Sequence, residues 1–215
     1  MYSLADMQLR QYHFRYLQHA CRVLYPDEQL LRNTYETAKA ANAEMPFPYW
    51  ARLWPASIAL SEFIIDHSNL LHSKTVLELA AGVGLPALVA SAFATKVYCS
   101  DYIADAVNLA EESVKLNGIN NMECMQLDWN QHSVFPAADV VLMSDVNYEP
   151  AAFDGLLQVF QVLLQQQKTI VLASPQRLMA KPFIAALLPF VQQQQQRNVC
   201  LHAVTTAISL YVLKQ

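Results

Sequence analysis

From Lys74 onward, short apolar runs alternate with longer segments in which apolar residues recur every three or four positions. Short β-rich apolar runs are typical of buried strands, and the three-to-four spacing is typical of helices. The pattern predicts five strands, at residues 75–80, 96–101, 122–128, 139–145 and 169–174. Strands that alternate with helices form a parallel sheet covered on both faces, so we expect an α/β fold.

The two ends of the chain depart from this alternation. Residues 198–205 and 207–214 are two apolar runs with almost nothing between them, which predicts an antiparallel hairpin. Apolar and polar residues recur at helical spacing over residues 4–44, which predicts two or more helices there. Another helix is predicted at residues 55–68. The glutamine runs at 165–167 and 192–196 indicate a helix face and a loop. We expect a single domain over residues 1–215, with an N-terminal helical extension (1–47) before the core (48–215).

Composition and charge narrow the possible partners. The chain has 215 residues, 54% hydrophobic and 15% charged, which is typical of a globular protein. Its net charge of −4, without a cluster of Lys and Arg, predicts no nucleic-acid partner. Glu78 interrupts the long apolar run 76–94, which therefore does not indicate a membrane span. The first residues lack an apolar signal core, so we expect a cytoplasmic protein.

Acidic residues stand at or near the ends of four consecutive predicted strands. They are Glu78, Asp101, Asp128 and Asp145. Ligands of an open parallel sheet bind outside the carboxyl ends of its strands. Two of the four glycines of the chain, Gly82 and Gly84, follow the first strand. Each carboxylate alone could cap a helix, but together with the glycine loop they predict a ligand that carries several hydrogen-bond donors. Histidines and cysteines show no metal-ligand spacing, so no metal is expected.

Two cofactors compete for this loop. Residues 82–87 fit the dinucleotide pattern G-x-G-x-x-G/A, and Asp101 stands where a ribose-binding acid belongs. Against a nicotinamide cofactor, Pro86 lacks an N–H for the pyrophosphate, and the Glu78 carboxylate would lie near the same anion. S-adenosylmethionine has no phosphate, and its amino group, ribose hydroxyls and sulfonium suit carboxylates. The residues therefore favour methyl transfer over hydride transfer.

Five motifs in one order carry a family resemblance: LWPASIALSEFI, VLELAAGVGLPAL, VYCSDY, LDW and VVLMSDVNYEP. With them, the chain from about Pro48 to Gln215 resembles the seven-β-strand S-adenosylmethionine-dependent methyltransferases, and among these the family 16, lysine methyltransferase-like group. The resemblance implies a Rossmann-like seven-stranded sheet, mostly parallel, with a C-terminal antiparallel hairpin and helices on both faces. It also implies an enzyme that N-methylates a lysine side chain of a protein by direct in-line transfer.

The resemblance assigns roles residue by residue. It implies that Asp145 and Tyr148 hold the methyl acceptor. The residues that it places at S-adenosylmethionine are Trp54, Glu78, Ala80, Ala81, Gly82, Gly84, Asp101, Asp128, Trp129 and Ser144. The family usually has glycine at the position of Ala80, where a side chain disfavours positive φ. For this position we expect an altered cofactor affinity with binding retained.

Three alternatives remain open at the level of sequence. The acceptor could be a small-molecule amine instead of a protein lysine. The chain could be a nicotinamide-dependent oxidoreductase, or it could be a binding module without activity, which only Ala80 encourages. The oligomeric state is not predicted.

Overall fold

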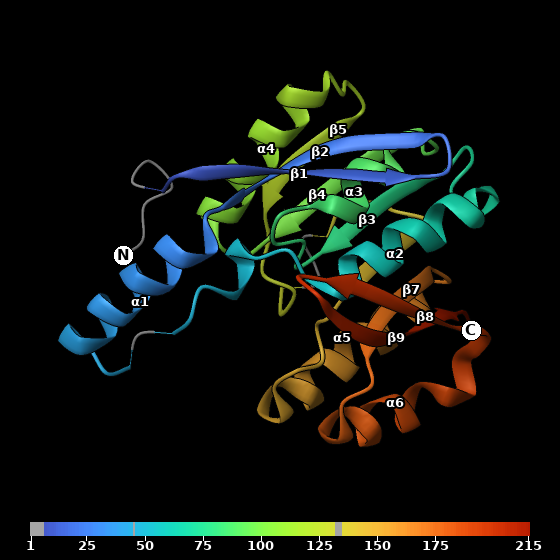
Figure 1. Cartoon of the computed structure of the whole chain (residues 1–215). Helices are drawn as coiled ribbons and strands as arrows, with labels where there is room; N and C mark the ends of the chain where they lie inside the picture. Colours follow the sequence, from blue (N-terminus) through green and yellow to red (C-terminus); the bar gives the residue numbers. More distant parts are fainter. Residues whose placement is uncertain (1–6, 45, 132–134) are drawn as a thin grey trace.

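Five parallel strands form most of the main sheet of the computed structural model, which describes residues 7–44, 46–131 and 135–215. They are β3 (Thr75–Leu79), β4 (Lys96–Asp101), β5 (Met122–Gln126), β6 (Val140–Ser144) and β7 (Thr169–Pro175). The antiparallel hairpin of β8 (Val191–Leu201) and β9 (Val204–Leu213) completes the sheet through β9, which pairs with β7. The order is β5-β4-β3-β6-β7-β9-β8, so the chain reverses direction across the sheet between β3 and β6. The predicted seven-stranded fold is confirmed (Figure 1).

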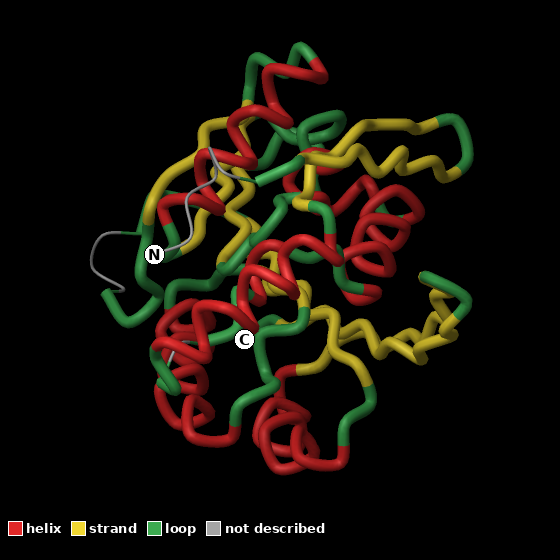
Figure 2. Tube along the Cα trace, turned by 60° about the vertical axis from the view of Figure 1, so that its left-hand side comes forward, coloured by secondary structure: helices red, strands yellow, loops and turns green. Residues whose placement is uncertain are grey.

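Helices cover both faces of this sheet (Figures 1 and 2). One face packs against α2 (Pro55–Asp66), α3 (Leu85–Ala90) and α4 (Ala104–Asn117). The other face packs against α5 (Phe153–Gln165) and α6 (Lys181–Leu187). Short 3-10 helices are η2 (Tyr49–Ala51), η3 (Ser68–Leu70), η5 (Pro150–Ala152), η6 (Leu178–Ala180) and η7 (Leu188–Phe190).

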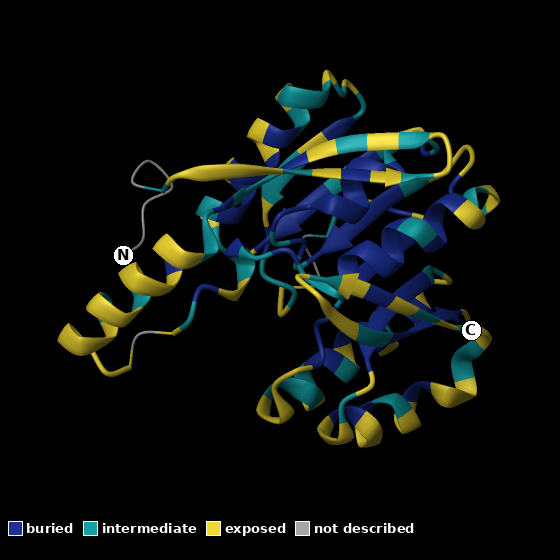
Figure 3. Ribbon diagram, in the orientation of Figure 1, coloured by how far each residue is buried: buried dark blue, intermediate teal, exposed yellow. Residues whose placement is uncertain are grey.

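Burial on both faces explains why the strands are almost continuously apolar. In β3, Val76 belongs to the core beneath α2, α3 and α4, whereas Leu77 belongs to the core beneath α5 and α6. Both side chains are buried, because successive strand residues point to opposite faces. Figure 3 shows the central strands as buried and the outer helix faces as exposed.

The N-terminal segment is a β-hairpin followed by one helix, so the predicted helical extension is wrong for residues 9–26. Strands β1 (Leu9–Tyr16) and β2 (His19–Pro26) pair antiparallel, and α1 (Glu28–Ala41) follows them. In β1 the aromatic residues Tyr12, Phe14 and Tyr16 pack against the core, while the residues between them are exposed. This alternation with a period of two is a strand pattern. It explains why the segment forms a strand, although its apolar residues also fit helical spacing. The expected boundary at residue 47 stays a prediction.

The hairpin docks on the C-terminal end of α4. The Asn117 side chain accepts from the Arg22 backbone N–H at 2.9 Å and donates to the Arg22 carbonyl at 2.6 Å. Ser113 Oγ accepts from Leu24 N–H at 3.0 Å. Phe14 is buried against the α2–α4 core and is only 2% exposed. The hairpin therefore belongs to the same hydrophobic core as the sheet.

The C-terminal hairpin is confirmed, although its turn lies earlier than expected. His202 and Ala203 form the turn with φ of 50° and 61°. Glycine and asparagine are the usual residues at such angles, so neither His202 nor Ala203 indicates a turn from sequence. The expected loop at 192–196 is wrong, because these glutamines lie in the edge strand β8. Among the described residues, no helix is long and apolar enough to cross a membrane.

We expect Phe14→Ala to lower the free energy of unfolding by about 3–5 kcal/mol, the range for a buried Phe truncated to Ala. The reason is that Phe14 joins the hairpin to the core. Urea denaturation measures the change. His13→Ala, on the exposed face of the same strand, is the control and should stay within about 0.5 kcal/mol of the parent. A Phe14→Ala protein as stable as its parent would show that the hairpin does not fold with the core.

Candidate active site

The loop between β3 and α3 passes close to its neighbours with unusual backbone angles. Ala80, Gly82 and Gly84 all have positive φ, at 52°, 53° and 75°. A Cβ at Gly82 would stand 3.0 Å from the Trp50 carbonyl oxygen, and one at Gly84 would stand 3.0 Å from Cys99 Sγ. Glycine is favoured at both positions because it adopts positive φ without strain, and a Cβ would crowd Trp50 or Cys99. Ala80 adopts the left-handed conformation despite its methyl group.

Glu78 lies in the interior, at the start of this loop. Its Oε2 accepts from Ala87 N–H of α3 at 2.8 Å, while its Oε1 is buried and has no hydrogen-bond partner among the described residues. Burial raises the pKa of Glu78 well above its usual range; the Ala87 N–H opposes this rise, and the neighbouring Asp101 adds to it. An interior carboxyl with one free oxygen is suited to accept from a ligand that reaches the loop.

Asp101 closes β4 and holds the glycine loop from the other side. Its Oδ2 accepts from Gly82 N–H at 2.9 Å, and its Oδ1 accepts from Ile103 N–H at 3.0 Å. Burial raises the pKa of this carboxyl, and its backbone hydrogen bonds lower it. Each oxygen retains a further lone pair, so the side chain can still accept from ligand hydroxyls.

The end of β5 lies beside the end of β4, because Leu127 N–H donates to the Asp101 carbonyl at 2.9 Å. This contact brings Asp128 to the carboxyl edge, where its Oδ1 accepts from Asn130 N–H at 2.9 Å and from the Asn130 amide at 2.8 Å. Trp129 is half-buried against the core beneath α5 and α6. The predicted residues of three strand ends therefore meet at one edge of the sheet.

An aromatic series connects the entry segment, residues 46–54 before α2, to the predicted acceptor motif at residues 145–148. The Tyr49 ring lies 6.0 Å from the Trp54 ring and 5.4 Å from the Tyr148 ring. Trp54 Nε1 donates to the Tyr49 carbonyl at 3.0 Å, and the Arg52 guanidinium lies 4.9 Å above the Trp54 ring. Tyr49 therefore joins a predicted cofactor residue to a predicted acceptor residue.

The end of β6 carries the predicted acceptor motif. Ser144 is half-buried at the last position of the strand, and Asp145 follows it with φ 56°. Both carboxylate oxygens of Asp145 are bound by the guanidinium of Arg177, which follows β7; Nη2 lies 3.0 Å from Oδ2, and Nη1 binds Oδ1. Tyr148 is 41% exposed. Asp145 and Tyr148 thus lie in one loop, with the carboxylate paired and the tyrosine partly exposed.

Carboxylates and tyrosines dominate the rim of this edge. Burial raises the pKa values of both Tyr102 and Tyr148, and the neighbouring carboxylates add to the rise. For Tyr102 these neighbours are Asp101, Glu149 and Asp128. The rim therefore favours a cationic molecule over an anionic one.

The site contains residues that the sequence did not predict, among them Arg177, Tyr49, Tyr102 and Glu149. Arg177 could have been found, because it stands just beyond the fifth parallel strand, and the rule that ligands bind at strand ends applies to that strand as well. Tyr49 lies in the aromatic segment before Trp54, but nothing in its local pattern distinguishes it from its neighbours. Ala81, also predicted, is a buried residue of the loop between β3 and α3.

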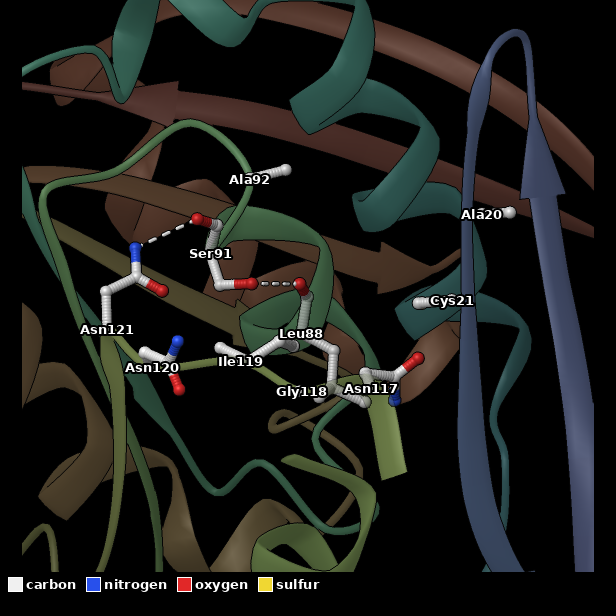
Figure 4. Close-up of a pocket in the computed structure, with 10 residues that line it drawn as sticks. All are labelled: Ala20, Cys21, Leu88, Ser91, Ala92, Asn117, Gly118, Ile119, Asn120 and Asn121. Carbon is white, nitrogen blue, oxygen red and sulfur yellow. Dashed lines mark hydrogen bonds between the residues drawn. The ribbon is translucent and has the colours of Figure 1, made fainter. Parts of the chain in front are cut away.

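A surface pocket of about 460 Å³ lies elsewhere, between β2 and the C-terminal ends of α3 and α4 (Figure 4). Three of its polar side chains, those of Ser91, Asn117 and Asn121, already have partners within the protein. Asn121 Nδ2 donates to the Ser91 carbonyl at 2.9 Å, and Ser91 Oγ donates to the Leu88 carbonyl at 2.7 Å. The pocket contains none of the predicted site residues. In the described part of the chain, no group of three or more His, Cys, Asp or Glu could hold a metal ion.

Comparison with known proteins gives a consistent assignment. Residues 49–189 match the family described as lysine methyltransferase, methyltransferase family 16. The chain is 31% identical over 146 residues to the Xenopus laevis histone-arginine methyltransferase METTL23, a match that covers 65% of this chain and 60% of that protein. It is 30% identical over 128 residues to the Danio rerio electron transfer flavoprotein beta subunit lysine methyltransferase, covering 59% of this chain and 49% of that protein. The chain spans about half the length of the curated relatives it matches.

The fold also matches solved structures. The 16S rRNA N2 G1207 methyltransferase of T. thermophilus, solved with AdoMet and guanosine, aligns with a TM-score of 0.64 and 15% identity. The alignment covers 96% of this chain and 51% of that one. At this identity, the likeness concerns the fold alone.

We expect Ala80→Gly to leave the free energy of unfolding unchanged or to raise it by up to about 1 kcal/mol. Glycine removes the strain that alanine has at positive φ in the folded state. This gain offsets the greater conformational entropy of glycine in the unfolded chain. Ala81→Gly is the control, because Ala81 lies outside the left-handed region and is buried. It should lose at least about 0.5 kcal/mol. Equal losses in both variants, measured by urea denaturation, would contradict this account of Ala80.

Glu78→Gln should gain stability relative to the parent as the pH rises. Burial raises the pKa of the folded carboxyl above its unfolded value of about 4.3. The stabilisation from this carboxyl is therefore complete below about pH 4 and is lost as the pH rises through the folded pKa. Glutamine does not ionise and shows no such loss. Melting temperatures between pH 4 and pH 8 test this, with exposed Glu36→Gln as the control for one lost charge. A difference that does not grow with pH would refute the prediction.

Proposed function

The chain belongs to the lysine methyltransferase family, methyltransferase family 16, and from this membership we propose that it transfers a methyl group from S-adenosylmethionine to a basic side chain of a protein. Lysine is the first candidate acceptor. The observation that carries the proposal is the convergence of carboxylates at one edge of the sheet, next to an exposed aromatic acceptor motif.

The described residues fit S-adenosylmethionine. Glu78 offers a buried oxygen without a partner among the described residues, Asp101 offers free lone pairs, and Gly82 and Gly84 carry no side chain on the loop. Glu78, Asp101, Ala80, Ala81, Gly82 and Gly84 would hold the methionine and ribose parts, and Asp128, Trp129, Trp54 and Ser144 would border the rest. When bound, the cofactor supplies a methyl group activated by its sulfonium.

A nicotinamide cofactor fits less well. Its pyrophosphate would need free N–H groups at the start of α3. Ala87 N–H is already bound to the Glu78 carboxylate, and Pro86 has no N–H. An internal carboxylate therefore occupies the position that the pyrophosphate requires. This observation supports S-adenosylmethionine over the oxidoreductase alternative.

The openness of the acceptor side supports a protein substrate. Tyr49, Tyr102 and Tyr148 are 48%, 65% and 41% exposed, so this side of the site opens onto the protein surface. A small-molecule ligand is usually enclosed, with about 70–90% of its own surface buried. The acidic rim would attract a basic segment and repel nucleic-acid phosphate. A small-molecule amine and a nucleic acid are both less consistent with this surface. The expected cytoplasmic location stays a prediction.

Asp145 and Tyr148 would orient the acceptor nitrogen. A lysine has a pKa near about 10.4 and must lose a proton before it can attack. Partial burial among the rim tyrosines favours the neutral amine. Since Arg177 already binds both oxygens of Asp145, we expect the proton to leave to water at the exposed side of Tyr148. Positioning then does most of the work in an in-line transfer.

Arginine is the second candidate acceptor. Several relatives are named histone-arginine methyltransferases, and a guanidinium would be attracted by the same acidic rim. Amino-acid analysis of the labelled product distinguishes methyl-lysine from methyl-arginine.

The test uses labelled S-adenosylmethionine and core histones as a basic acceptor, with serum albumin as an acidic control. We expect calorimetry to detect binding of S-adenosylmethionine and none of NAD.

Asp101→Ala should weaken cofactor binding by about 1.5–3 kcal/mol, the range for hydrogen bonds to a charged group. Asp145→Asn should leave cofactor affinity within a few-fold and reduce methyl transfer by about 100-fold.

Melting curves control for folding, since Asp101→Ala also removes the acceptor of Gly82 N–H. Binding of NAD alone would overturn the cofactor assignment. Equal methyl transfer by the parent and Asp145→Asn would remove Asp145 from the acceptor site. Transfer to albumin as fast as to histones would contradict the basic substrate.

A further inference from the structure

The contact between Asp145 and Arg177 joins the ends of two neighbouring strands. Arg177 binds the carboxylate with both terminal nitrogens, the fork-to-fork geometry that makes arginine pairs directional. The Asp145 side chain is 7% exposed and that of Arg177 is 32% exposed. A carboxylate so far out of water depends on its partner, whereas the arginine reaches it from the solvent side.

The backbone around Asp145 depends on the same neighbouring strand. Its φ of 56° lies in the left-handed region, which a non-glycine residue adopts only at a cost that its surroundings must offset. Asp145 N–H donates to the Ala173 carbonyl at 2.9 Å, and Ser174 Oγ donates to Asn147 Oδ1 at 3.0 Å. Together with the Arg177 pair, three contacts from residues at or just beyond the end of β7 therefore support this loop.

From this geometry we propose that Arg177 is a positioning residue for methyl transfer: it fixes the Asp145 carboxylate in the orientation that receives the acceptor nitrogen. The inference rests on the proposed function and adds a residue to it. Arg177 itself does not need to touch the acceptor or the cofactor.

The lone pairs of the carboxylate show how this would work. An ionised carboxylate offers about four acceptor positions, and a bidentate guanidinium takes two of them. The other two stay free and point in directions that Arg177 determines. A lysine at this position would supply the charge without the planar fork, so it would not fix the orientation.

A second arginine ion pair gives a matched control. Arg197 of β8 binds Asp66 and lies 3.3 Å from Glu62, and its side chain is 11% exposed. Asp66 ends α2, the helix that begins at Pro55 next to Trp54. A helix of twelve residues is about 18 Å long, so this pair lies well away from the acceptor motif.

The experiment compares Arg177→Gln, Arg177→Lys, Asp145→Asn, the double variant Arg177→Gln/Asp145→Asn, and Arg197→Gln. For each, kcat and KM are measured with core histones, cofactor affinity by calorimetry, and stability by melting. We expect Arg177→Gln to lower kcat by roughly 10- to 100-fold, as a misplaced group would, with cofactor affinity within a few-fold. Relative to Arg177→Gln, Arg177→Lys should recover the melting temperature of the parent but only part of its kcat. Arg197→Gln should melt earlier and keep kcat within about two-fold.

The double variant decides whether Arg177 acts through Asp145. If it does, the double variant is no slower than Asp145→Asn alone, because the group that Arg177 positions is already lost. Multiplied losses would overturn the inference, as would a folded Arg177→Gln protein with the kcat of the parent. Full recovery of kcat by Arg177→Lys would also overturn it, because charge alone would then suffice. A parent that binds S-adenosylmethionine but methylates no histone would overturn the proposed function first, and the role of Arg177 with it.

Discussion

The buried hydrogen bond between Ala87 N–H and the Glu78 carboxylate, 2.8 Å long, sets the conformation on which the site depends. It ties the end of β3 to the start of α3 and closes the loop between them. With its ends fixed, the loop must turn through positive φ at Ala80, Gly82 and Gly84. The same bond fills the helix N-terminus with an internal carboxylate. A loop that binds phosphate leaves the N–H groups at the helix N-terminus free, whereas here the Glu78 carboxyl binds one of them.

The two halves of the site are built differently. On the side proposed to hold the cofactor, backbone amides are held by side-chain carboxylates, as Gly82 N–H is by Asp101. On the side proposed to hold the acceptor, a side-chain carboxylate is held by a guanidinium, as Asp145 is by Arg177. Tyr49 lies between the halves, with ring contacts to both Trp54 and Tyr148. Under the proposed function, a change at Tyr49 would therefore affect cofactor and acceptor binding together.

The rim combines negative charge with exposed aromatic rings, a surface that suits a cationic protein segment. Tyrosine faces attract ammonium and guanidinium groups, and the carboxylates between them add long-range attraction. The solved structures of similar fold include an rRNA methyltransferase. Among the described residues at this edge, the two arginines Arg52 and Arg177 lie against Trp54 and Asp145. The fold is thus shared, and under the proposed function the charge at the strand ends selects the kind of acceptor.

The sequence by itself determined the sheet and most of the carboxylate cluster. Apolar runs must be buried whatever their partners, and parallel strands bring their carboxyl ends to one edge, so Glu78, Asp101 and Asp128 could be placed together without coordinates. It did not determine the β1–β2 hairpin, whose alternating aromatics over Tyr12–Tyr16 compete with helical spacing. Only the tertiary structure brought Arg177 to Asp145, 32 residues apart in the chain, and forced Ala80 into the left-handed region. The first outcome depends on how the segment after β7 lies beside the end of β6, elements that are distant in sequence. The second depends on the Glu78–Ala87 hydrogen bond that closes the loop around Ala80. The local pattern of apolar and polar residues specifies neither contact.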